Sequence, residues 1–198
     1  FFDGYKKNKE YAKEVLQRAW KAGADLLVLA DTNGGSEYFE SSQIMEDLTK
    51  EFDFKFGIHC HNDSGLAVVN TIEAVRKGAI QVQGTVNGYG ERCGNANLCE
   101  VIPNLQLKLG YEVLGENIKQ LTSLSRYVSE ISNMQPALNM PFVGTNAFGH
   151  KGGIHVSAVM KNSSTYEHIS PDMVGNERKI LISDLYGKSN VLYKLREF

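Results

Sequence analysis

The sequence predicts an α/β fold built on a parallel sheet. Short apolar runs typical of buried strands alternate with longer stretches whose apolar residues recur every three to four positions, as in helices. In order, the predicted elements are a helix at 8–22, a strand at 26–30, a helix at 36–51, a strand at 54–58, a helix at 65–77, a strand at 80–86 and a helix at 96–109. This alternation favours parallel strands joined by right-handed crossovers. The order alone does not distinguish a (β/α)₈ barrel from an open, doubly wound sheet.

Local residues support each of these elements. The first helix carries apolar residues at helical spacing, among them Leu16 and Trp20, and Gly23 can end it. The run at 26–30 is continuously apolar, as expected for a strand covered on both faces. The later helices have the same helical spacing, and Gly78 follows the one at 65–77. Polar, glycine-containing loops follow all three strands, and active sites of parallel α/β folds are built at those strand ends.

The alternation of strands and helices stops after about residue 112. Residues 115–132 predict an amphipathic helix, 134–149 predict a long loop with two prolines, and 151–162 predict a short helix. We therefore expect two domains. Residues 1–133 would form the α/β domain with its trailing helix, and residues 134–198 a small, mostly helical subdomain.

Composition excludes several classes of function. A net charge of −2 and a pI near 6.2 argue against binding to nucleic acid. No apolar run approaches the roughly 20 residues of a membrane span, and there is no signal-peptide pattern. The three cysteines have no Cys-x-x-Cys spacing, which indicates neither a disulfide framework nor a zinc knuckle. We expect a cytoplasmic protein that binds neither nucleic acid nor membrane.

Two histidines separated by one residue follow the predicted strand at 54–58. Because alternate residues of a strand point the same way, His59 and His61 should project from one face, and Cys60 from the other. Imidazoles placed in this way can bind one metal ion. The alternative is a polar strand end whose histidines bond to the backbone.

Three motifs together resemble one family of enzymes. They are Phe-Gly-Ile-His-Cys-His-Asn-Asp-Ser-Gly-Leu-Ala at 56–67, Gly-Tyr-Gly-Glu-Arg-Cys-Gly-Asn-Ala-Asn-Leu at 88–98 and Lys-Gly-Gly-Ile-His at 151–155. In this order they resemble the 2-isopropylmalate, homocitrate and citramalate synthases, metal-dependent TIM-barrel enzymes that perform Claisen condensations. Phe-Phe-Asp-Gly-Tyr-Lys-Lys-Asn at 1–8 and Asp-Thr-Asn-Gly-Gly at 31–35 are most similar to the citramalate synthase branch. The resemblance covers nearly the whole chain.

The resemblance implies a fold and a reaction. The α/β part would be the C-terminal half of a (β/α)₈ TIM barrel, followed by a linker subdomain. The family also carries an Asp-Arg-Glu motif and a catalytic Glu on earlier strands, and this chain lacks both. We therefore expect a fragment that is inactive alone. The enzyme would condense acetyl-CoA with a short 2-oxo acid, pyruvate, to give citramalate, in branched-chain amino acid (isoleucine and leucine) biosynthesis. The alternatives are a 2-isopropylmalate synthase acting on 2-oxoisovalerate, or a catalytically silent half-barrel that only assembles or binds.

The resemblance also implies a divalent metal site. His59, His61 and Asn95 match three of the family's metal ligands, and the ion would be Mg²⁺, Mn²⁺ or Zn²⁺. Taken by itself, Asn95 could instead cap the helix that follows it. Asp63 would orient a histidine or cap the next helix.

The remaining roles concern substrates and proton transfer. Thr32 matches a residue that binds the carboxylate of the oxo acid, and Glu91 and Arg92 would lie near acetyl-CoA. By themselves, Thr32 could be an ordinary turn residue, and Glu91 and Arg92 could pair with each other or be solvated. His155 and Tyr166 match acid/base groups that the linker subdomain supplies to a neighbouring subunit, so we expect a homodimer.

Overall fold

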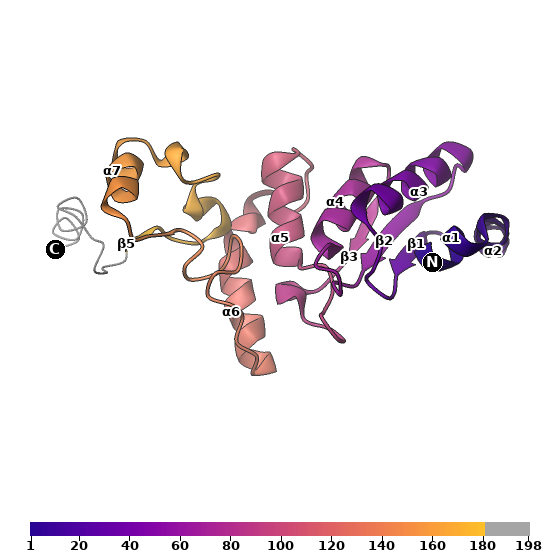
Figure 1. Ribbon diagram of the computed structural model, residues 1–198, viewed down its shortest axis with the longest axis horizontal. Coiled ribbons are helices and arrows are strands. Elements are labelled where there is room, and N and C mark those ends of the chain that lie inside the picture. The colour runs from indigo at the N-terminus through magenta and orange to yellow at the C-terminus, as the bar shows by residue number, and fades with distance from the viewer. Residues whose placement is uncertain (181–198) are drawn as a thin grey trace. The chain divides into compact units, whose positions relative to one another are not determined.

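The computed structural model describes residues 1–180 (Figure 1). The chain divides into two compact units. The units are Phe1–Asn104 and Leu105–Phe198. This division falls earlier in the chain than the expected domain boundary between residues 133 and 134, which stays a prediction. The end of the expected linker subdomain, 181–198, lies outside the described residues.

The first unit contains a parallel sheet in the order β1-β2-β3. Its elements are α1 (Phe2–Lys7), α2 (Lys9–Lys21), β1 (Leu27–Asp31), α3 (Tyr38–Glu51), β2 (Phe56–Cys60), α4 (Ala67–Arg76), β3 (Gln81–Gln83), the 3₁₀ turn η1 (Val86–Gly88) and α5 (Leu98–Pro103). The predicted alternation of strands and helices is confirmed, whereas α1 was not predicted. Strand β3 is shorter than expected because the chain enters η1 and Thr85 forms a bridge with Asn97.

The helix-covered face of the sheet holds the core of this unit. Leu29 of β1 lies opposite Ile58 of β2, which lies opposite Val82 of β3. Leu29 and Ile58 are fully buried, and burial of such a side chain contributes about 1.5–3 kcal/mol. Helix α4 lies against this face, and its fully buried Thr71 lies beside the Cys60 thiol. The next residues along each strand, Ala30, His59 and Gln83, are also register partners and point to the opposite face.

The second unit is mostly helical. The described elements are the π-helical segment Asn104–Lys108 at the junction, η3 (Gly115–Gln120), α6 (Leu121–Ser132), β4 (Gly149–His150), α7 (Gly153–Lys161), η4 (Ser163–Thr165), η5 (Pro171–Val174) and β5 (Lys179–Ile180). Strands β4 and β5 pair in parallel. The helix predicted at 115–132 occurs as η3 running into α6. The helix predicted at 96–109 is irregular, because Pro103 lacks an N–H and a π-helical turn follows it.

Within residues 1–180, none of the helices has the length and apolar character needed to cross a membrane.

Candidate active site

His59 and His61 lie together at the C-terminal end of β2. Their ring centroids are 5.3 Å apart, with an angle of 66° between the ring planes. The backbone N–H of His61 donates to the Asp31 carbonyl of β1 at 3.1 Å, which holds the second histidine one residue beyond the strand. The two imidazoles therefore lie close together, as the alternation of a strand requires.

Asn95 lies directly opposite His61. The two residues form an antiparallel bridge, flanked by hydrogen bonds from Asn62 N–H to the Gly94 carbonyl and from Ala96 N–H to the Cys60 carbonyl, both 2.9 Å. In this type of pair the side chains share a face, with Cβ atoms about 5 Å apart. The structure thus brings the three predicted metal ligands to one place on the sheet edge.

The helix-cap alternative for Asn95 is wrong, because another residue has that function. Helix α5 begins at Leu98, and the side chain of Asn97 accepts a hydrogen bond from the Cys99 N–H at 3.0 Å. The Asn95 side chain instead donates through Nδ2 to the Tyr89 carbonyl at 3.4 Å, which leaves Oδ1 directed elsewhere.

Two atoms of this cluster are buried and lack a hydrogen-bond partner among the residues that the structure describes. They are Nδ1 of His61 and Oδ1 of Asn95. Leaving such an atom unsatisfied costs about 1–3 kcal/mol, a cost that a bond to a bound group would offset. An imidazole nitrogen and an amide oxygen are both donors to divalent metals, and these residues therefore fit a metal ion. Among residues 1–180, no three His, Cys, Asp or Glu side chains gather as a metal site, so further ligands would have to complete this one.

The surroundings of His59 favour the neutral imidazole. Burial lowers the pKa of His59, proximity to His61 lowers it further, and a hydrogen bond with the Gln83 side chain opposes both effects. Only a neutral imidazole can ligate a metal. Sequence reasoning did not single out Gln83, although its register position opposite His59 follows from the parallel pairing.

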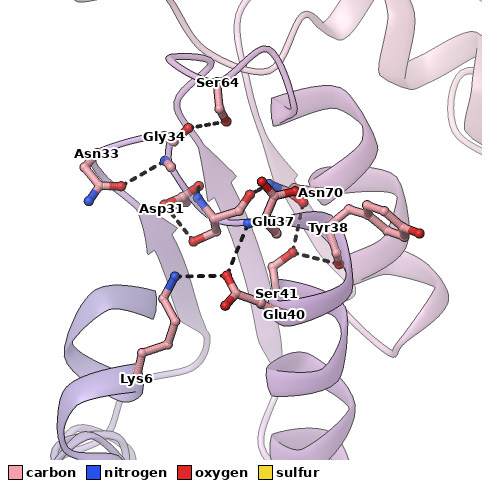
Figure 2. Close-up of polar contacts among 12 residues, drawn as sticks. Lys6, Asp31, Asn33, Gly34, Glu37, Tyr38, Glu40, Ser41, Ser64 and Asn70 are labelled. Carbon is pink, nitrogen blue, oxygen red and sulfur yellow. Dashed lines mark hydrogen bonds and ion pairs between the residues drawn. The ribbon is translucent and has the colours of Figure 1, made fainter.

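Thr32 begins the exposed loop after β1, and the residues around it are firmly held (Figure 2). The buried Asp31 carboxylate accepts hydrogen bonds from the N–H and the hydroxyl of Ser36, at 3.2 and 3.0 Å. Asn70 of α4 donates to the Ser36 carbonyl at 2.8 Å and accepts from Ser41 at 2.9 Å. These bonds fix both ends of the loop that carries Thr32.

Arg92 pairs with Asp63, not with Glu91. Its Nε and Nη2 donate to the two carboxylate oxygens of Asp63 at 2.8 and 3.0 Å, and Nη2 also donates to the Thr32 carbonyl at 2.7 Å. This pairing lowers the pKa of Asp63. Glu91 is exposed. Asp63 does not cap the helix that follows it. The side chain at the start of α4 that accepts a hydrogen bond is that of Asn62, whose Oδ1 accepts from the Ala67 N–H at 3.2 Å.

The glycines of the loop at 88–94 allow it to fold tightly around Asn95. A Cβ at Gly90 would collide with the Asn95 amide, and Gly94 has a φ of +84° and no room for a Cβ beside the Gly88 carbonyl. The sequence shows these glycines, but their close contacts with Asn95 and Gly88 could be seen only in the structure.

The second unit contains the predicted acid/base pair. The rings of His155 in α7 and Tyr166 have centroids 4.4 Å apart, and both residues are exposed. The next residue, Glu167, is buried and accepts hydrogen bonds from Arg178 Nε and Nη2, both at 2.6 Å. Its Oε1 also lies 3.1 Å from His150 Nε2.

Comparison with known proteins agrees with the predicted resemblance. Residues 3–128 match the HMGL-like family, and residues 142–198 match the homocitrate synthase post-HMGL domain-like family. The whole chain is 58% identical over 200 residues to an (R)-citramalate synthase of Aquifex aeolicus, of which it covers 38%. It is also 41% identical over 194 residues to a 2-isopropylmalate synthase of Sulfolobus acidocaldarius, covering 96% of this chain and 50% of that protein.

The fold has neighbours among solved structures. The HMG-CoA lyase of Bacillus subtilis superposes with a TM-score of 0.56 at 20% identity, over 64% of this chain and 44% of that one. This likeness and the parallel strands confirm the predicted α/β fold of the TIM-barrel type. The chain spans about 38% of the length of the citramalate synthase it matches. Because the HMGL-like match extends over most of its residues, the chain belongs to the HMGL-like family.

Proposed function

We propose that the protein is a citramalate synthase, which condenses acetyl-CoA with pyruvate in a metal-dependent reaction. The observation that carries this proposal is the pair of buried, unpartnered ligand atoms on His61 and Asn95, beside His59. The similarity to citramalate synthases along the entire chain supports the same assignment.

The sheet edge of the first unit would hold the metal and the oxo acid. His59, His61 and Asn95 would bind a divalent ion, Mg²⁺, Mn²⁺ or Zn²⁺. When bound, such an ion polarises the keto group of the oxo acid. The exposed Thr32 would bind the carboxylate of that acid, and Glu91 would lie near acetyl-CoA.

His155 and Tyr166 would act as the acid/base pair. Their rings are in contact and exposed, so each can exchange protons with a bound substrate. We infer that the protein forms a homodimer, in which this pair serves the neighbouring subunit. We also infer a cytoplasmic enzyme of branched-chain amino acid biosynthesis.

The chain alone would not be active. Its 198 residues contain no Asp-Arg-Glu sequence. The three-stranded sheet of the first unit, as the structure describes it, also cannot enclose a barrel that needs eight strands. Catalysis would therefore require groups in addition to those described above.

The test is release of free thiol from acetyl-CoA, measured with the protein as its gene encodes it and with this 198-residue chain in parallel. We expect thiol release that depends on pyruvate and on a divalent metal from the former, and none from the latter. Asn95→Ala should abolish the release, whereas Lys50→Ala, a change in an exposed ion pair on α3, should not.

Two results would contradict the proposal. A clear preference for 2-oxoisovalerate would indicate a 2-isopropylmalate synthase, a class to which the chain is also similar. Absence of thiol release with either acid would favour an assembly module without catalysis.

A further inference from the structure

A single arginine connects the loops that follow all three strands of the sheet. We call the arrangement of Arg92, the Asp63 carboxylate and the Thr32 carbonyl the Arg92 clasp. Its three hydrogen bonds are 2.8, 3.0 and 2.7 Å long, and they join residues 29 and 60 positions apart in the sequence. Thr32 follows β1, Asp63 follows β2, and Arg92 belongs to the loop after β3 and η1.

The backbone is arranged to allow this connection. Arg92 has a φ of +58°, a conformation that disfavours any residue with a side chain. The loops after β1 and β2 are also bonded directly to each other. Ser64 donates to the Gly34 carbonyl through its N–H at 3.0 Å and its hydroxyl at 2.6 Å. A Cβ at Gly34 would lie 2.5 Å from Asp63 Oδ2. Figure 2 shows the bond from Ser64 to Gly34, so the first two loops are in direct contact.

Stability alone does not account for the clasp. The side chains of Arg92 and Asp63 are 40% and 25% exposed, and exposed ion pairs contribute little to folding. What the clasp fixes is position. The carbonyl of Asp31, directly before Thr32, accepts the His61 N–H, and Asp63 follows His61 by two residues. The clasp therefore restrains Thr32 relative to the predicted metal ligands.

We propose that Arg92 is a positioning residue, which holds Thr32 in place for the carboxylate of the 2-oxo acid and does not itself bind acetyl-CoA. This inference rests on the proposed function for its substrate. Three hydrogen bonds from its Nε and Nη2 are directed at Asp63 and Thr32, whereas a residue that binds coenzyme A would offer these donors to the ligand. Loss of the groups that support metal ligands costs about 10- to 100-fold in affinity or activity, and we expect an effect of this order for a group that supports a substrate-binding residue.

The test compares Arg92→Ala and Arg92→Lys in the protein as its gene encodes it. Arg76→Ala is the matched control, because Arg76 also pairs with a carboxylate, that of Glu73 at 2.7 Å, but within one helix. Two quantities are measured: the KM for each substrate, and the hydrogen exchange of segments 32–36 and 61–65 by mass spectrometry. The exchange measurement does not depend on catalysis.

We expect Arg92→Ala to raise the KM for pyruvate about tenfold, to leave the KM for acetyl-CoA unchanged, and to speed exchange in both segments. Arg92→Lys should give a smaller rise in the KM for pyruvate and a smaller increase in exchange. A lysine keeps the positive charge, but its ammonium cannot form the bidentate pair with Asp63. Arg76→Ala should match the unaltered protein. A rise in the KM for acetyl-CoA alone, or unchanged exchange in Arg92→Ala, would overturn the proposal. If the unaltered protein does not turn over pyruvate, the proposed function fails, and the exchange rates still decide whether the clasp positions the loops.

Discussion

Replacing Gly90 by alanine should weaken metal binding without disturbing the backbone. Gly90 does not have a positive φ, so alanine is compatible with its conformation. Its Cβ, however, would lie closer than 3.0 Å to Asn95 Nδ2 and 3.1 Å from Cγ. To restore an ordinary contact of about 3.5 Å, the amide must move by about 1 Å. A binding site tolerates displacements of only about 0.5 Å.

The expected loss is about 10- to 100-fold in affinity for Mg²⁺ or Mn²⁺, or about 1.4–2.7 kcal/mol. Titration calorimetry with the protein as its gene encodes it measures this affinity, and urea unfolding shows that the variant is folded. Gly4→Ala is the matched control, because Gly4 lies in α1 with nothing within 4 Å of its Cβ. Unchanged metal affinity in Gly90→Ala would show that the Asn95 amide is not a ligand.

Three further predictions concern stability and reactivity. Burial raises the pKa of Glu167, but the hydrogen bonds with Arg178 and His150 outweigh it, so the pKa is lowered overall. The ionised Glu167 therefore stabilises the fold fully above about pH 4.3, and this stabilisation is lost as the pH falls through the lowered pKa. Glu167→Gln should cost about 3 kcal/mol at pH 7 and should flatten the acid limb of stability measured by urea unfolding. Burial raises the pKa of the Cys60 thiol to about 12, so a disulfide reagent at pH 8 should modify the exposed Cys93 and leave Cys60 intact in the native protein, as mapped by mass spectrometry. Gly34→Ala should destabilise more than Gly65→Ala in thermal unfolding, by about 1–3 kcal/mol, because both have positive φ but only Gly34 lacks space for a Cβ; equal losses would contradict this.

The sequence predicted most elements of the first unit because their apolar periodicities are clear. It missed α1, whose N-cap residue, Phe1, provides no capping side chain. It overextended the third strand, because the apolar residues at 80 and 86 continue the pattern while the backbone turns into η1. Periodicity records which residues can be buried, and it does not show where a strand loses its partner.

The candidate site was predictable where neighbouring residues determine it. The alternation of a strand places His59 and His61 together, and the family resemblance added Asn95. The partner of Arg92 was not predictable, because Asp63 is 29 residues away and an arginine carries no local sign of its partner. The distinction between Asn95 and Asn97 as helix cap also required the backbone, since both asparagines precede an apolar residue.

The left-handed backbone at Arg92 places two opposing demands on one position. A glycine there would adopt the positive φ without strain but would remove the guanidinium. A β-branched residue would be strained at this φ and would also lack the guanidinium. Few amino acids can therefore occupy position 92 if the loops are to remain joined. In any related sequence, the residue found there indicates whether that protein fastens its strand-end loops in the same way or must hold them by other means.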